Sequence, residues 1–114
     1  MPARYMARIA DGMLTEALAT GGAVQVKGPK WCGKTATSLQ QAASVVYLQD
    51  PDRSASYLAL ADAKPSALLE GRVPRLIDEW QMAPQLWDAV RFAVDLRGEP
   101  GQFILTGSST PTVG

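Results

Sequence analysis

One segment restricts the possible folds of this chain more than any other. Residues 28–35 read GPKWCGKT, which matches the pattern G-x-x-x-x-G-K-[ST] in full. In that pattern the glycines let the backbone curl, so that successive N–H groups point into one anion-sized hollow. The N-terminus of the helix behind the hollow adds partial positive charge where a phosphate lies. The pattern has this meaning only where a strand precedes it and a helix follows it.

The sequence on both sides supplies that context. Residues 23–27 (AVQVK) alternate and are β-branched, which predicts a short strand ending at Gly28. Residues 34–43 are good helix formers, which predicts a helix. We therefore expect a phosphate-binding loop in which Lys34 reaches the β- and γ-phosphates and the Thr35 hydroxyl holds Mg²⁺. The residues expected at the nucleotide are Gly28, Pro29, Lys30, Trp31, Cys32, Gly33, Lys34, Thr35 and Ala36.

The rest of the chain continues the alternation of strands and helices. Apolar residues recur at helical spacing from Ile9 to Leu18, and Gly21-Gly22 follows as a stop signal. Further strands are predicted at residues 45–48, 75–78 and 102–105, and further helices at 53–61, 65–70 and from Pro84 to a C-cap at Gly98. This order predicts a parallel α/β sheet, and 114 residues predict one domain.

An acidic pair narrows the class of protein. The predicted strand at residues 75–78 ends in Asp78, and Glu79 follows directly. A carboxylate at a strand tip can approach Mg²⁺ beside the phosphate loop, which is the role predicted for Asp78. Glu79 could polarise a water toward the γ-phosphate. Such a pair is typical of ATPases with an additional catalytic glutamate rather than of GTPases and many P-loop kinases.

Hydroxyl groups follow the last predicted strand. Residues 103–109 read FILTGSS. If this strand lies between the loop strand and the Asp78 strand, Thr106 or Ser108 would contact the γ-phosphate as a polar probe, and Ser108 is the preferred candidate.

Composition excludes several other function classes. The chain contains no His and one Cys, so it lacks a histidine base, a histidine-ligated metal and a thiolate zinc site. It contains no Asn, and therefore no guanine-selecting Asn-Lys-x-Asp motif. Eleven basic residues balance eleven acidic ones, so nucleic acid is not indicated as a partner. No apolar run approaches the roughly 20 residues of a membrane helix. We expect a cytoplasmic protein without a membrane partner.

These motifs together resemble the ATPase domain of the AAA+ superfamily. They are most similar to prokaryotic predicted ATPases that pair this domain with a C-terminal domain of unknown function. The stretches that carry the resemblance are residues 28–35, 47–53, 76–81 with Ala83-Pro84, and 103–109. The resemblance implies a three-layer P-loop fold with strand order 5-1-4-3-2, bound ATP and Mg²⁺, catalysis by Lys34 and Glu79, and a γ-phosphate sensor at Ser108 or Thr106.

The resemblance also implies a longer domain. A fifth strand, an arginine finger and a helical lid would follow Ser109, so residues 1–114 would be the N-terminal part of the domain. We expect weak or absent turnover from this part alone, because an arginine finger can contribute about 10³-fold or more. Without a fifth strand the loop-bearing strand becomes an exposed sheet edge, through which the chain could self-associate.

Two other functions stay open from the sequence. The first is an ATP-dependent switch that does not hydrolyse its nucleotide and whose state an unknown protein partner reads. The second is a P-loop phosphotransferase, which would need an acceptor pocket that the sequence does not indicate.

Overall fold

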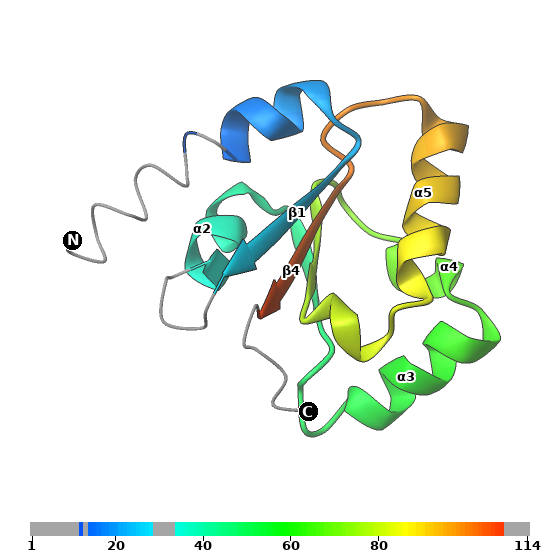
Figure 1. Ribbon diagram of the computed structural model, residues 1–114. Helices are drawn as coiled ribbons and strands as arrows, with labels where there is room; N and C mark the ends of the chain where they lie inside the picture. Colours follow the sequence, from blue (N-terminus) through cyan, green and yellow to red (C-terminus); the bar gives the residue numbers. More distant parts are fainter. Residues whose placement is uncertain (1–11, 13, 29–33, 109–114) are drawn as a thin grey trace.

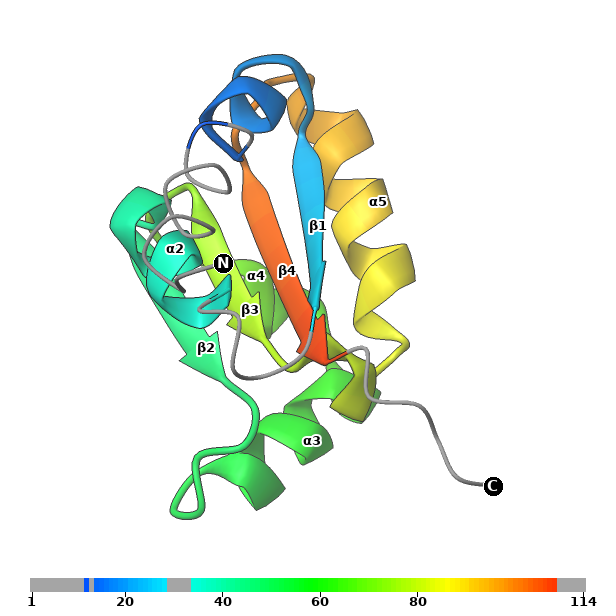
Figure 2. The same cartoon turned by 60° about the vertical axis from the view of Figure 1, so that its left-hand side comes forward.

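The computed structural model describes residues 12, 14–28 and 34–108, which form a parallel sheet between two layers of helices. The four strands are β1 (Ala23–Gly28), β2 (Ser44–Tyr47), β3 (Arg75–Asp78) and β4 (Phe103–Ser108). They pair in the order β1-β4-β3-β2, and each pairing is parallel (Figures 1 and 2). The α/β fold class is thereby confirmed, as is the 1-4-3-2 part of the implied strand order; a fifth strand would lie outside the described residues.

The helices connect successive strands. They are α2 (Lys34–Gln41), α3 (Ser54–Ala63), α4 (Ser66–Leu69) and α5 (Leu86–Arg97), with a 3₁₀ turn η2 (Trp80–Met82) between β3 and α5. A further helical segment over residues 14–20 precedes β1. Figure 2 shows α2 and α5 on opposite sides of the sheet. No helix within the described part of the chain is long and apolar enough to cross a membrane.

Alternate residues of the central strands pack into two separate cores. Leu76 and Ile104 lie in a smaller core with Leu14 and Leu18 of the N-terminal helical segment. The next residue on each strand faces the other way into a larger core. That core contains Val46, Leu48, Ala61, Leu68, Leu69, Ile77, Ala83, Leu86, Val90, Phe103 and Leu105. Burial on both faces is what a parallel sheet with helices on each side requires, and it confirms the three-layer arrangement.

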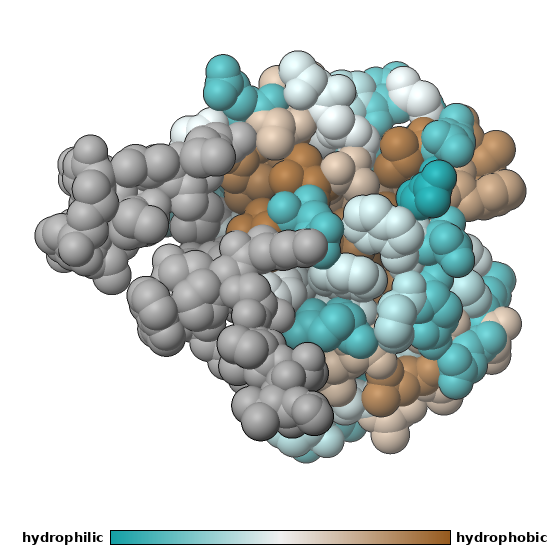
Figure 3. All heavy atoms as spheres, in the orientation of Figure 1, coloured by the Kyte–Doolittle hydropathy of each residue, from teal (hydrophilic) through white to brown (hydrophobic). Residues whose placement is uncertain are grey.

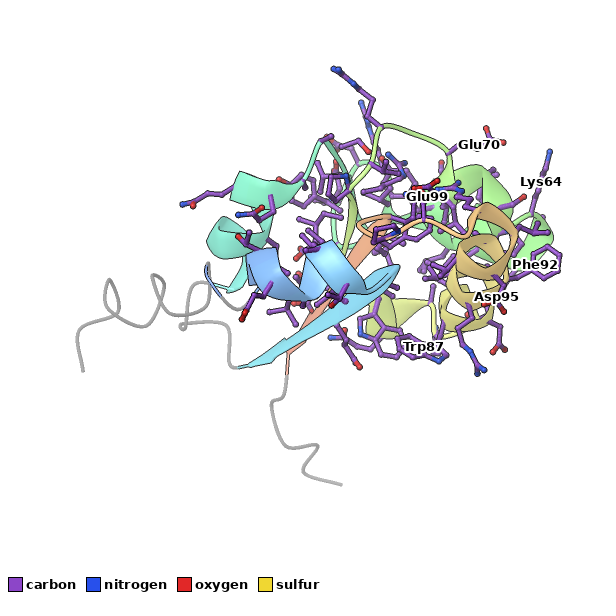
Figure 4. All side chains as sticks on the ribbon, turned by 90° about the horizontal axis from the view of Figure 1, so that it is seen from above. Lys64, Glu70, Trp87, Phe92, Asp95 and Glu99 are labelled. Atoms are coloured by element: carbon purple, nitrogen blue, oxygen red, sulfur yellow. The ribbon has the colours of Figure 1, made fainter. Side chains whose placement is uncertain are left out.

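Gly98 ends α5 in the left-handed conformation (φ 64°), as the sequence predicts. Leu86 and Val90 are buried against the sheet, whereas Phe92 and Leu96 are 67% and 72% exposed. Phe92 points away from the sheet in Figure 4, and apolar residues are visible at the α5 edge of the molecule in Figure 3.

Arg75 joins three elements at the amino end of β3. Its Nε donates to the Leu68 carbonyl of α4 at 2.7 Å, and its Nη1 donates to the Ser44 hydroxyl of β2 at 3.0 Å. Burial lowers the pKa of the Arg75 guanidinium, and the nearby Tyr57 opposes that shift. The guanidinium also lies against Gly71 (φ 153°), where an added Cβ would come within 2.5 Å of Nη1. Arg75 thus acts as a structural bridge.

The structure differs from the sequence analysis in two local features, one strand end that was predicted too early and one turn that was not predicted. The last strand does not end at Leu105, because β4 continues through Thr106 and Gly107 to Ser108 by pairing with β1 as far as Gly28. The turn η2 was not predicted; it follows Glu79, which adopts a left-handed backbone conformation. In β4, pairing with β1 extends the strand beyond the residues whose own propensity predicts it. After β3, the left-handed backbone of Glu79 leads into a turn that the sequence pattern does not indicate.

Candidate functional site

The three strands that carry predicted motifs end at the same edge of the sheet, the one formed by the carboxyl ends of its strands. The phosphate-loop strand β1 ends at Gly28, β3 ends at Asp78 and β4 ends at Ser108. Gly28 is in register with Ser108, and Asp78 is in register with Thr106. Because the strands are parallel neighbours, their carboxyl ends meet, which is where ligands bind in open α/β sheets. Figure 2 shows the arrowheads of β1 and β4 side by side at this edge.

The context that the phosphate loop requires is present. β1 ends at Gly28 and α2 begins at Lys34, so a strand enters the loop and a helix leaves it. Lys34, Thr35 and Ala36 form the first turn of α2. The other predicted loop residues, Pro29, Lys30, Trp31, Cys32 and Gly33, lie outside the described residues.

Asp78 is a buried carboxylate at the tip of β3. Its side chain is only 9% exposed, and Oδ1 accepts a hydrogen bond from Thr106 Oγ1 at 2.7 Å. Thr106 is itself fully buried. The structure therefore brings one of the two predicted sensor residues to the predicted metal ligand. A hydrogen bond to the carboxylate fixes the orientation of Asp78.

Ser108 takes a different position on the same strand. It lies two residues beyond Thr106, at the last position of β4. Its register partner is Gly28, the first residue of the phosphate loop. Of the two hydroxyl-bearing residues, Ser108 is the one level with the loop.

Glu79 leaves the strand in a sharp turn. Its backbone is left-handed (φ 60°, ψ 49°), a conformation that non-glycine residues seldom adopt and that occurs often at functional sites. The side chain is 4% exposed, and Gln81 Nε2 donates a hydrogen bond to Glu79 Oε2. Two successive carboxylates are thus buried at one sheet edge, although the turn separates their directions.

Trp80 and Gln81, which follow the acidic pair, lie at the same edge of the sheet, a placement that the sequence does not predict. Trp80 and Gln81 pack over Gly107 of β4, where an added Cβ would lie 3.2 Å from Trp80 Nε1 and 2.7 Å from Gln81 Oε1. Trp80 also packs against Trp87 with ring centroids 5.5 Å apart. A glycine inside a strand is the one sequence signal of such a close approach.

The side chains at this edge suit a hard cation that is bound partly by protein oxygens and partly by the phosphates of a substrate. Within residues 12, 14–28 and 34–108, no group of three or more His, Cys, Asp or Glu side chains could hold a metal ion. Mg²⁺ commonly binds through one or two protein oxygens together with substrate phosphates. A single oriented carboxylate beside a phosphate loop fits that mode of binding.

Comparison with known proteins agrees with this geometry. A family model described as an AAA domain matches residues 20–113, from the end of the N-terminal helical segment through all four strands. No curated protein and no solved structure matches the chain.

Proposed function

The chain belongs to the AAA domain family, and we propose that it binds ATP with Mg²⁺ and hydrolyses the bond between the β- and γ-phosphates. Family membership supports a nucleotide-binding function of ATPase type. One observation carries the finer proposal: a strand–loop–helix phosphate motif on β1 and a buried, hydrogen-bonded carboxylate on β3 lie at the same sheet edge, with β4 between them. A cytoplasmic location fits this function.

The residues would divide the work as follows. The loop amides from Gly28 onward and the Lys34 ammonium bind the phosphates, while Thr35 and Asp78 hold Mg²⁺. When bound, Mg²⁺ would supply neutralisation of the negative charge on the phosphates. Thr106 holds Asp78 in place through its 2.7 Å hydrogen bond, which leaves Ser108 as the residue that senses the γ-phosphate.

Glu79 is assigned to the attacking water. Its carboxylate polarises a water that attacks the γ-phosphorus in line with the bridging oxygen. The bond between that oxygen and phosphorus breaks, and the products are ADP and inorganic phosphate. This reaction needs positioning and charge neutralisation rather than a covalent intermediate.

Two substitutions test binding and hydrolysis separately. Lys34→Ala should abolish the heat of ATP binding in calorimetry with Mg²⁺, whereas Glu79→Gln should keep it. In a phosphate-release assay Glu79→Gln should lower turnover by about 10² or more, since a positioned base contributes about 10²–10⁴-fold. Binding that survives Lys34→Ala contradicts nucleotide binding at the loop. Because residues 1–114 alone are expected to turn over weakly or not at all, binding without phosphate release counts against hydrolysis only when the longer domain is assayed; there it leaves the non-hydrolysing switch as the function.

We also propose self-association through β1. Among the described strands β1 pairs with β4 on one side only, and an exposed strand edge can pair with a second copy. Sedimentation at increasing concentration should show particles heavier than the 12.2 kDa chain. A monomer at all concentrations contradicts this proposal without affecting nucleotide binding.

A further inference from the structure

We propose that Gln81 is a positioning residue for Glu79: its side-chain amide holds the carboxylate in the orientation needed to activate water. The inference rests on the proposed function of Glu79 and assigns a role to Gln81, which is not among the predicted site residues. Gln81 touches neither ATP nor water in this proposal. It acts only through Glu79.

The backbone places Gln81 beside Glu79. Glu79 is left-handed, and the 3₁₀ turn that follows is closed by hydrogen bonds from Met82 N to Glu79 O at 3.1 Å and from Ala83 N to Trp80 O at 2.9 Å. These bonds turn the chain back so that the amide of Gln81 reaches the side chain two residues before it. Gln81 Nε2 donates to Glu79 Oε2.

The other side of the Gln81 amide lies against β4. Its Oε1 would be 2.7 Å from a Cβ added to Gly107, so only a glycine there leaves room for this amide. Gly107 stands between Thr106 and Ser108. The amide therefore lies between the Glu79 carboxylate and the strand that carries both candidate hydroxyls, which ties the direction of Glu79 to that strand.

The chemistry of the contact fits a positioning role. An amide N–H to a carboxylate is a charge-assisted hydrogen bond, which is stronger and more directional than a neutral one. Glu79 is buried, whereas Gln81 is exposed and can be replaced without opening the core. Loss of the donor removes this restraint on the direction of the carboxylate, and a misplacement of about 1 Å in a reacting group can cost about 10²-fold in rate.

The chain offers a matched control. Gln85 Nε2 donates to Asp62 Oδ1 at 2.7 Å, which is the same pair of groups in an exposed position between the start of α5 and α3. Gln85→Ala removes an equivalent contact and leaves the sheet edge untouched. Any general effect of losing a glutamine–carboxylate contact will appear in that variant.

The first experiment measures phosphate release against ATP concentration. Gln81→Ala should lower kcat by about 10- to 100-fold with KM within about twofold, since orientation and not binding is lost. Gln81→Glu, which keeps the shape but cannot donate, should lose at least as much. Gly107→Ala should lower kcat in the same direction by displacing the amide. Gln85→Ala should match the unaltered chain. Wild-type kcat in Gln81→Ala overturns the proposal while Glu79→Gln still tests the proposed function.

The second experiment does not depend on turnover. In ¹⁵N-labelled protein the side-chain amide signal of Gln81 should shift on Glu79→Ala, and that of Gln85 should not. An unmoved Gln81 signal overturns the contact and with it the proposal. Absence of phosphate release from the longer domain overturns the proposed hydrolysis and the catalytic role of Gln81 together, while a shifted amide signal would still identify the contact as structural.

Discussion

Strand β3 has charged side chains at both ends, a guanidinium at its amino end and carboxylates at its carboxyl end. At the amino end the Arg75 guanidinium donates to a backbone carbonyl and to the Ser44 hydroxyl. At the carboxyl end Asp78 accepts from Thr106, and the next residue is a second buried carboxylate, Glu79. Both ends are built from hydrogen-bonded charges, so burial and bonding alone do not distinguish a functional site from a structural one.

The difference lies in what each end can still do. The Arg75 guanidinium connects α4, β2 and β3. Its hydrogen bonds go to the Leu68 carbonyl and the Ser44 hydroxyl, both of which belong to the secondary structure that forms the fold. Two successive buried carboxylates instead lie at the edge where β1 leads toward α2, and a cation stabilises buried charges of this kind. We therefore expect a ligand to change the electrostatics at the carboxyl end, whereas the amino end stabilises the fold.

The largest expected effect comes from Asp78→Asn. The amide can still accept from Thr106, so the thermal midpoint should hardly change, but the negative charge for Mg²⁺ is lost. We expect phosphate release to fall by about 10² or more, comparable with the loss of a transition-state group worth about 3 kcal/mol. A Mg²⁺ titration of the release rate measures it, and an unchanged Mg²⁺ dependence would contradict the assignment of Asp78.

Arg75→Ala should have the opposite profile. It leaves the Leu68 carbonyl and the Ser44 hydroxyl without their donor, and hydrogen bonds to charged groups contribute about 1.5–3 kcal/mol. Urea unfolding should show a loss of about 2–3 kcal/mol, with ATP affinity unchanged in the remaining folded protein. The control is Arg72→Ala, an exposed arginine nearby, which should stay within about 0.5 kcal/mol. A change in affinity without a change in stability would invert the comparison.

Thr106→Val should lower stability less than Arg75→Ala and should impair Mg²⁺-dependent turnover less than Asp78→Asn. Valine keeps the shape but removes the donor to Asp78, which should cost about 1–2 kcal/mol of stability. Because Asp78 loses a contact that orients it, the Mg²⁺ concentration for half-maximal turnover should also rise by about 10-fold. Thr106→Ser, which retains a hydroxyl, should restore both values. A stability loss with unchanged Mg²⁺ dependence would make Thr106 purely structural.

The sequence predicts the fold more fully than the contacts of the site. The apolar run of β3 is bounded by Pro74 and the acidic pair, so its limits at Arg75 and Asp78 are predicted to the residue. β4 is longer than predicted because Gly107 and Ser108 are poor strand formers that pairing with β1 holds extended. Alternation of strands and helices indicates a parallel sheet but does not specify which strands are neighbours; that order came from the resemblance.

At the site, motifs identify the residues but not their partners. Asp78 and Glu79 stand out because they end and follow an apolar strand, and Thr106 because it directly follows the last predicted strand. The hydrogen bond between Asp78 and Thr106 joins residues 28 positions apart, and no local pattern encodes it. Gln81 was missed because its role depends on a left-handed Glu79 and on Gly107 of another strand, both of which arise only in the folded chain.

The smallest expected effect returns to the amino edge of the sheet. Gln102 is buried just before β4, where its Oε1 accepts from Arg97 Nη1 at 3.0 Å and its Nε2 donates to the Pro100 carbonyl at 3.2 Å. Gln102→Ala should cost about 1 kcal/mol in urea unfolding, less than Arg75→Ala, because the contact with Pro100 is neutral and the charged Arg97 is exposed. ATP affinity and Mg²⁺ dependence should not move. If they did, the two edges of the sheet would be coupled, and the division between a stabilising edge and a ligand-binding edge would no longer hold.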